Sequence, residues 1–236
     1  MEITQHELHS LVADVDDVHQ ESMRTLGEEL EEVHFGETGR KLSLARRRFL
    51  KQAGAGAALV GVGANMTWLM GRAAAQEDVP DIGAAQFAAG VELAAVGAYE
   101  AAAGRGLLDE ATIALATVFL GHHQAHAATF NGLLSQVGAE ENNTANEDLL
   151  AQFGPMIEEA ADVPALLEIA LTLEEAAAST YYAALGVLTL PDAALAVAQI
   201  LPVEAQHATV LATALGKPID DRNPPFITEG LALPLG

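Results

Sequence analysis

The chain has 236 residues, a net charge of −22 at neutral pH and no cysteine. The acidic balance argues against a nucleic-acid partner, because the phosphate backbone would be repelled, and the lack of cysteine excludes disulfides and thiolate chemistry. Half of the residues are apolar but only 5% are aromatic. A composition this rich in alanine favours close-packed helices over sheets, so we expect an all-α fold.

Residues 1–44 form an acidic N-terminal extension in which apolar residues recur at helical spacing. The pattern predicts an amphipathic helix, whose apolar positions are Leu8, Leu11, Val12, Val15 and Val18. Alternatively, Met23 starts the chain. Acidic and polar residues surround the histidines of the extension, so we expect their side chains on the solvated surface. These histidines are His6, His9, His19 and His34.

Residues 45–75 carry the pattern of an export signal. A basic run, Arg46 to Lys51, precedes twenty uncharged residues, and a small-residue cleavage site follows between Ala75 and Gln76. The Arg-Arg-x-Phe-Leu-Lys run resembles the twin-arginine signal. That resemblance implies a partner in the twin-arginine translocation machinery and an exported, periplasmic or extracellular protein. The alternative is a retained membrane anchor, because about twenty residues can cross a bilayer.

The pattern of residues 76–216 predicts four long helices, followed by a Pro-rich tail at 217–236. We expect the helices at about 81–103, 109–137, 162–188 and 191–216. Asp81 is the expected N-cap of the first helix. The connections within the first and the second pair are short, which makes each pair antiparallel neighbours. The connection at 138–161 is long, and we expect it to be partly helical near 149–161.

The second helix pair looks like a diverged copy of the first. The matching positions, 82 or 81 residues apart, are Glu92 with Glu174, Tyr99 with Tyr181, His123 with Glu204, and His126 with His207. Counted from the short turns at about 1.5 Å per residue, the four helices bring these acidic residues and histidines to roughly one level. The glutamates among them have apolar neighbours three and four residues away, where an unpaired carboxylate is costly, so the pattern indicates a bound metal. Glu175 has polar neighbours and is expected to point to water.

This arrangement resembles the ferritin-like proteins, four-helix bundles with a long crossover between the second and third helices. Their di-iron sites take one Glu from each of two helices and Glu-x-x-His from each of the other two. The resemblance implies six metal ligands, which are Glu92, His123, His126, Glu174, Glu204 and His207. This chain departs from the pattern at His123, where the family has Glu, so a bridging carboxylate is in question. His122 is an alternative to His123 after a small helix rotation.

The resemblance implies a dinuclear metal cofactor, iron foremost, with manganese or zinc as alternatives. Three hypotheses remain open. One is redox chemistry on ferrous iron, dioxygen or peroxide, the second is a metal-stabilised structural or stress-related bundle without catalysis, and the third is a bundle whose polar residues only bond one another. Tyr99 and Tyr181 either hydrogen-bond the ligands, relay an electron or simply pack in the core. A homo-oligomer is compatible with the sequence.

Overall fold

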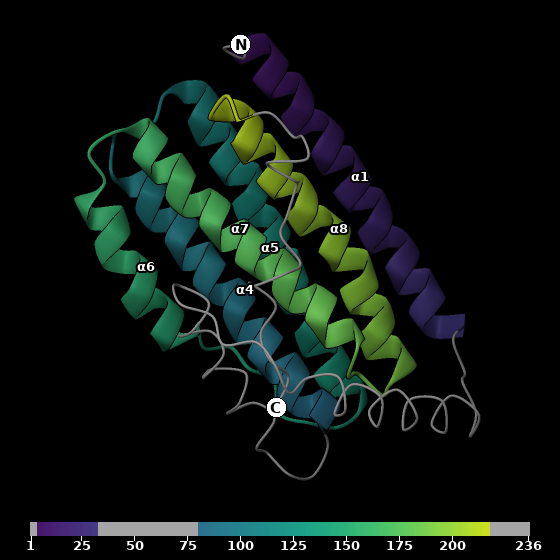
Figure 1. Cartoon of the computed structure of the whole chain (residues 1–236). Helices are drawn as coiled ribbons and strands as arrows, with labels where there is room; N and C mark the ends of the chain where they lie inside the picture. The colour runs from purple at the N-terminus through teal and green to yellow at the C-terminus, as the bar shows by residue number, and fades with distance from the viewer. Residues whose placement is uncertain (1–3, 33–79, 218–236) are drawn as a thin grey trace.

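The computed structural model of the chain describes residues 4–32 and 80–217. Within these ranges it contains helices and no strand (Figure 1), so the expected all-α architecture is confirmed. The helices are α1 (Gln5–Glu32), α4 (Pro80–Gly104), α5 (Glu110–Gln136), α6 (Glu147–Glu159), α7 (Val163–Leu185) and α8 (Pro191–Ala214). The predicted export signal, His34 and residues 218–236 lie outside the described ranges.

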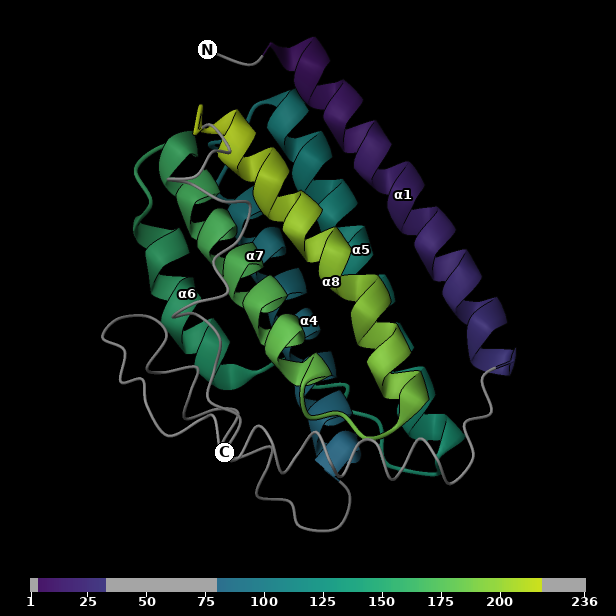
Figure 2. The ribbon, with the colours of Figure 1, turned by 45° about the vertical axis from the view of Figure 1, so that its right-hand side comes forward.

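Four helices, α4, α5, α7 and α8, form a bundle in which α4 lies against α5 and α7 lies against α8. The short connections of the sequence predicted these two pairings. The long connection between α5 and α7 contains α6, which packs on α4 and α7 at one side of the bundle (Figures 1 and 2). The structure therefore has the crossover that the spacing of the helices predicted.

Short polar side chains start three of the helices. The side chains of Asp109, Asn146 and Asp162 accept hydrogen bonds from backbone N–H groups in the first turns of α5, α6 and α7. Such caps satisfy amides that have no partner inside the helix. After α5, Gly138 has a φ of +70°, a left-handed conformation that glycine adopts without a steric penalty. These signals explain why the predicted and observed boundaries of α5 nearly coincide.

Two boundaries differ from the prediction. Asp81 is not the N-cap of α4 but lies in its first turn, and its carboxylate accepts bonds of 2.9 Å from the Thr189 amide and 2.7 Å from the Leu190 amide. Asp81 therefore helps to start α8, a tertiary contact that local sequence does not reveal. Helix α7 ends not near 188 but at Leu185, where the amides of Gly186 and Val187 close tighter, three-residue turns onto the carbonyls of Ala183 and Ala184.

Alanine dominates the contacts between the helices. Many buried positions of the bundle are alanine, and large rings such as those of Phe119 and Phe130 are at most 2% exposed. Small side chains let helix axes approach closely, so a few large rings fill the remaining space. By length and composition, α4 is apolar enough over Asp81–Gly104 to cross a membrane, and in this structure most of that stretch is buried.

Helix α1 packs along α8 and α5, on the side of the bundle away from α6 (Figures 1 and 2). The predicted amphipathic pattern is confirmed at Leu8, Val12 and Val15, which are buried, whereas Val18 is 47% exposed. The expectation for His19 was wrong, because this side chain is only 5% exposed. His19 faces the bundle since it lies seven residues, or two helical turns, after the buried Val12.

The other histidines of α1 follow the prediction. His6 and His9 are exposed. They differ from His19 because α1 touches the bundle along one stripe only, and His19 lies on that stripe. The burial of His19 was not predicted, because nothing in the sequence indicates that this helix packs on the bundle.

Candidate metal centre

The six predicted ligands lie together in the middle of the four-helix bundle. Helices α4 and α7 each contribute one of them, and α5 and α8 each contribute two from successive turns. Every one of the six side chains is at most 1% exposed; they are Glu92, His123, His126, Glu174, Glu204 and His207. The structure thus brings together the six residues that the sequence placed at one level.

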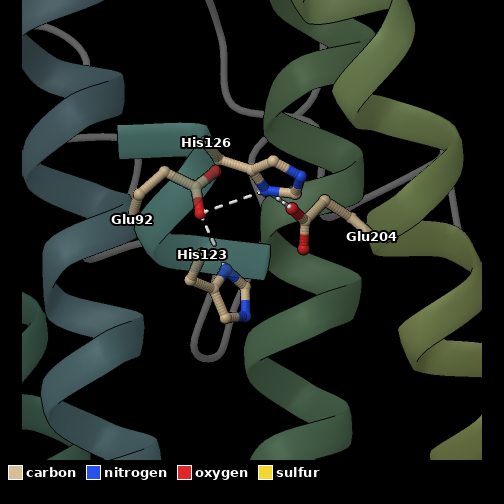
Figure 3. A group of neighbouring side chains, drawn as sticks. All are labelled: Glu92, His123, His126 and Glu204. Carbon is tan, nitrogen blue, oxygen red and sulfur yellow. Dashed lines mark hydrogen bonds and ion pairs between the residues drawn. The ribbon is translucent and has the colours of Figure 1, made fainter. Parts of the chain in front are cut away.

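The first group consists of Glu92, His123, His126 and Glu204, whose ligand atoms lie within 4.8 Å of one another (Figure 3). The Glu92 Oε2 atom is 2.7 Å from His123 Nδ1 and 3.5 Å from His126 Nδ1. On the opposite side, Glu204 Oε1 lies 2.8 Å from His126 Nδ1. The group draws carboxylates from α4 and α8 onto two imidazoles of α5.

The second group consists of His123, Glu174, Glu204 and His207, again with ligand atoms within 4.8 Å of one another. The Glu174 carboxylate lies between two imidazoles, with Oε1 3.1 Å from His123 Nε2 and Oε2 3.2 Å from His207 Nδ1. The Glu204 Oε2 atom is 3.6 Å from His207 Nδ1. The two groups are related as the two sequence repeats are.

His123 and Glu204 belong to both groups. His123 presents Nδ1 to Glu92 and Nε2 to Glu174, while Glu204 presents one oxygen to His126 and the other toward His207. Position 123, where this chain has histidine and the family has glutamate, thus belongs to both groups. A carboxylate has a donor oxygen for each group, whereas a neutral imidazole has a lone pair on only one ring nitrogen, so His123 serves both groups only after losing both ring protons.

Four buried polar atoms show that hydrogen bonds do not complete the cluster. Both ring nitrogens of His126 and both oxygens of Glu204 lack a hydrogen-bond partner among the described residues. The 2.8 Å contact of His126 Nδ1 with Glu204 Oε1 is an ion pair. Buried polar atoms without partners are costly. Atoms that converge without bonding one another are typical of ligands around a cation, so the residues present fit a metal.

The electrostatics of the metal-free cluster balance three carboxylates against three imidazoles. Burial disfavours the charged form of His126, but Glu92 and Glu204 outweigh this effect and raise its pKa to about 9. Burial likewise opposes ionisation of Glu92, but His126 and His123 outweigh it and lower the pKa of Glu92 to about 2. The same competition raises the pKa values of His123 and His207 and lowers that of Glu174. A metal ion must therefore displace protons from the imidazoles.

The two tyrosines of the repeat bond the ligands across the bundle. The Tyr99 hydroxyl, on α4, donates to Glu174 of α7, and the Tyr181 hydroxyl, on α7, donates to Glu92 of α4. Burial, and then the neighbouring carboxylates, raise the pKa of both phenols well above the usual range. Each hydroxyl therefore keeps its proton and fixes one carboxylate oxygen. Of the roles open to these tyrosines in the sequence, the structure contains two, hydrogen bonding to the candidate ligands and packing in the hydrophobic core.

His122 belongs to neither inner group, so it does not take the place of His123. Its Nδ1 lies 2.9 Å from His207 Nε2, and its Nε2 lies 3.0 Å from Asp16 Oδ1. His122 thus contacts the far nitrogen of a candidate ligand, a place from which it orients that ring. The sequence reasoning missed Asp16. Its spacing from His19, acidic residue-x-x-His, is the same as that of Glu204 and His207 and was the available signal.

Glu175 lies outside both groups, as predicted, but it is less solvated than expected. The side chain is half-buried, and burial raises its pKa.

The comparisons with known proteins agree with this geometry. The family model of the ferritin-like domain matches residues 80–217, which include all six candidate ligands and exclude α1. A comparison with curated proteins gives no significant match, and a comparison with solved structures gives none either. The matched stretch covers more than half of the chain and contains the whole four-helix bundle with its crossover. The chain therefore belongs to the ferritin-like domain family.

Proposed function

We propose that the buried centre binds two metal ions, iron foremost with manganese or zinc as alternatives, and carries out redox chemistry on ferrous iron, dioxygen or peroxide. One observation carries this proposal. Two overlapping groups of buried ligand atoms share His123 and Glu204, and the polar atoms of Glu204 and His126 make ion-pair contacts but no hydrogen bond among the described residues. A cluster made only for stability would bond its own polar atoms.

The residues divide into terminal and shared ligands. Glu92 and His126 would hold one ion, Glu174 and His207 the other, and Glu204 would contact both, as would His123 once its imidazole had lost both ring protons. When bound, two such ions supply the electrons for reduction of dioxygen or peroxide. The chain excludes water from the centre, because the ligands are at most 1% exposed. It also fixes the orientation of two ligands, because Tyr99 and Tyr181 each hold one carboxylate by a hydrogen bond.

The donor set favours borderline transition metals. Three imidazoles and three carboxylates suit iron and zinc, whereas a site richer in oxygen suits manganese better. The single substitution of histidine for glutamate at position 123 shifts the balance in this direction relative to the family pattern.

A metal-stabilised bundle without catalysis is the second candidate. The observation in its favour is that the six candidate ligands come from all four helices, so an ion bound by them would cross-link the bundle whether or not it reacts. The two candidates differ in one measurement. The redox protein oxidises added ferrous iron faster than a variant with an empty centre does, and the structural protein does not.

The decisive experiment is the metal-to-protein ratio of the purified chain. Glu174 and Glu175 are adjacent on α7, so the same substitution at each gives a test variant and its control. Glu174→Gln and His207→Ala should lower the metal content and slow any oxidation of ferrous iron, whereas Glu175→Gln should do neither. Equal metal in Glu174→Gln and Glu175→Gln would refute the assigned centre.

We propose that the protein is exported through the twin-arginine route. The Arg46–Lys51 run, the uncharged stretch after it and the small residues before Gln76 support this proposal. A protein that acquires metal in a folded bundle suits a route that carries folded proteins. The fold and the metal centre do not depend on this proposal.

A further inference from the structure

A third cluster of ligand-type residues lies where α1 meets α5. Asp16 and His19 come from α1 and His122 from α5, and their ligand atoms lie within 4.8 Å of one another. None of the three belongs to the inner groups. Two of them lie on a helix that the family match does not include, so the cluster belongs to this chain's own extension.

His19 is the part of this cluster that needs an explanation. Its side chain is 5% exposed, and its Nε2 has no hydrogen-bond partner among the described residues. The ring stacks on His122 at a centroid distance of 3.8 Å. An alanine or leucine would satisfy this interface without burying an unpartnered nitrogen. The position therefore points to a ligand for that imidazole.

The geometry of the other two residues fits a shared ion. The Asp16 Oδ1 and His122 Nε2 atoms are 3.0 Å apart. Two ligands of a tetrahedral zinc ion, each about 2.1 Å from it, lie about 3.4 Å apart, so a shift of a few tenths of an ångström would admit the ion between these atoms. A hydrogen bond also explains the 3.0 Å contact, so this pair alone does not indicate a cation. The buried nitrogen of His19 beside the pair is the second and independent observation.

We propose that Asp16, His19 and His122 form an outer site for a divalent transition-metal ion. Two imidazoles and one carboxylate are a donor set for iron, zinc and related borderline ions, and they leave positions open for water. The negative net charge of the chain favours cations over anions at such a site.

The place of this outer site suggests its role, which rests on the proposed function. The Asp16 side chain is 37% exposed and reaches solvent, whereas His122 Nδ1 lies 2.9 Å from His207 Nε2 at the inner centre. The outer site thus lies between solvent and the inner ligands. It receives an ion before the ion passes inward, and it exists only while α1 covers α5 and α8.

The test is the zinc stoichiometry of the full-length chain, stripped of metal and dialysed against Zn²⁺ with millimolar Mg²⁺ to occupy exposed carboxylates. The wild type should bind three ions. His19→Ala and Asp16→Asn should bind two, and Asp16→Asn keeps the shape of the side chain, so α1 stays packed. The controls His9→Ala and Asp17→Asn change exposed residues of the same helix and should still bind three.

Two outcomes separate this inference from the inner centre. If the wild type, His19→Ala and Asp16→Asn all bind two ions, the outer site is refuted and the inner centre stands. If the wild type binds one ion that His19→Ala loses, the outer site stands and the inner centre is refuted. For the transfer of ions, zinc should reach the inner ligands several-fold more slowly in Asp16→Asn than in Asp17→Asn. Equal rates would refute the transfer.

Discussion

The tyrosine hydroxyls that bond Glu174 and Glu92 are the residue-scale feature most open to test. Tyr99→Phe and Tyr181→Phe each remove one hydrogen bond from a buried carboxylate; Glu92 Oε1 then has none, whereas Glu174 Oε1 keeps its contact with His123 Nε2. Loss of a group that orients a metal ligand typically costs 10- to 100-fold in metal affinity, so we expect about a tenfold loss or more. Tyr182→Phe is the matched control, because Tyr182 is 51% exposed. Competition with a chelator of known affinity measures the effect, and equal affinities in all three variants would contradict it.

The titration of the metal-free centre gives a prediction with a defined sign. Because the pKa of His126 is raised from 6.5 to about 9, its stabilising contribution is complete below pH 6.5 and is lost as the pH rises through 9. Because the pKa of Glu92 is lowered from 4.5 to about 2, its contribution is present above pH 4.5 and is lost as the pH falls through 2. The free energy of unfolding of the metal-free protein should therefore be highest between pH 4.5 and pH 6.5, which denaturant unfolding at a series of pH values would measure.

Metal reverses the trend on the alkaline side. The ligand form of imidazole is neutral, so metal binding strengthens as the pH rises from 6.5 toward 9. The difference in Tm between metal-loaded and chelator-treated full-length chain should accordingly grow over this range. A difference that is zero, or constant with pH, would show that these imidazoles do not exchange protons for metal.

At the scale of the helices, Gly90 of α4 sets how closely the α5–α6 connection approaches. The Gly90 carbonyl accepts a 2.8 Å bond from the Asn146 amide, and an added Cβ would lie 2.8 Å from the Asn142 side-chain nitrogen. That nitrogen already donates to the Gln86 carbonyl at 2.7 Å, so it cannot yield without losing a bond. Small size is required here.

A pair of glycine variants tests this reading. Gly121 of α5 is exposed, and an added Cβ there meets nothing within 4 Å. Gly121→Ala should raise the free energy of unfolding by up to about 1 kcal/mol, the ordinary gain of alanine over glycine within a helix. Gly90→Ala should forfeit that gain and lower the free energy by about 1 kcal/mol, the value of one buried hydrogen bond. Denaturant unfolding measures both, and equal effects would refute the close approach.

At the scale of the whole molecule, the packing of α1 constrains the proposed export. A single membrane span at 52–71 would place α1 and α4 on opposite sides of the bilayer, whereas the structure has α1 on the bundle. Cleavage after Ala75 would separate α1 from the bundle covalently. A permanent anchor and the packed α1 are therefore mutually exclusive, and the proposed exported form is a bundle without α1.

Two measurements test the export. Changing Arg46, Arg47 and Arg48 together to lysine should leave the protein in the cytoplasm, and unchanged export would remove the twin-arginine proposal. Mass spectrometry of the exported wild type should give a chain that starts at Gln76. A mass that includes residues 1–75 would show that α1 travels with the bundle.

The sequence by itself determined the helical class, the two antiparallel pairs and the level of the six candidate ligands. Each of these follows from local signals or from counting. Alanine-rich composition, caps such as Asp109 and Asp162, and the short turns fix the helices, and the repeat relates Glu92 to Glu174 and His126 to His207. A rigid rise per residue turns sequence distance into height.

Only the tertiary structure decided which side chains meet across the bundle. Asp81 faces the start of α8, Tyr99 crosses to Glu174, and His19 is buried against His122, although each pair is more than 70 residues apart in the chain. Periodicity gives the face of a helix but not the neighbour of that face. For α1 the contact with the bundle determines which side chains are buried. Without that contact, its apolar stripe and His19 would lie in solvent.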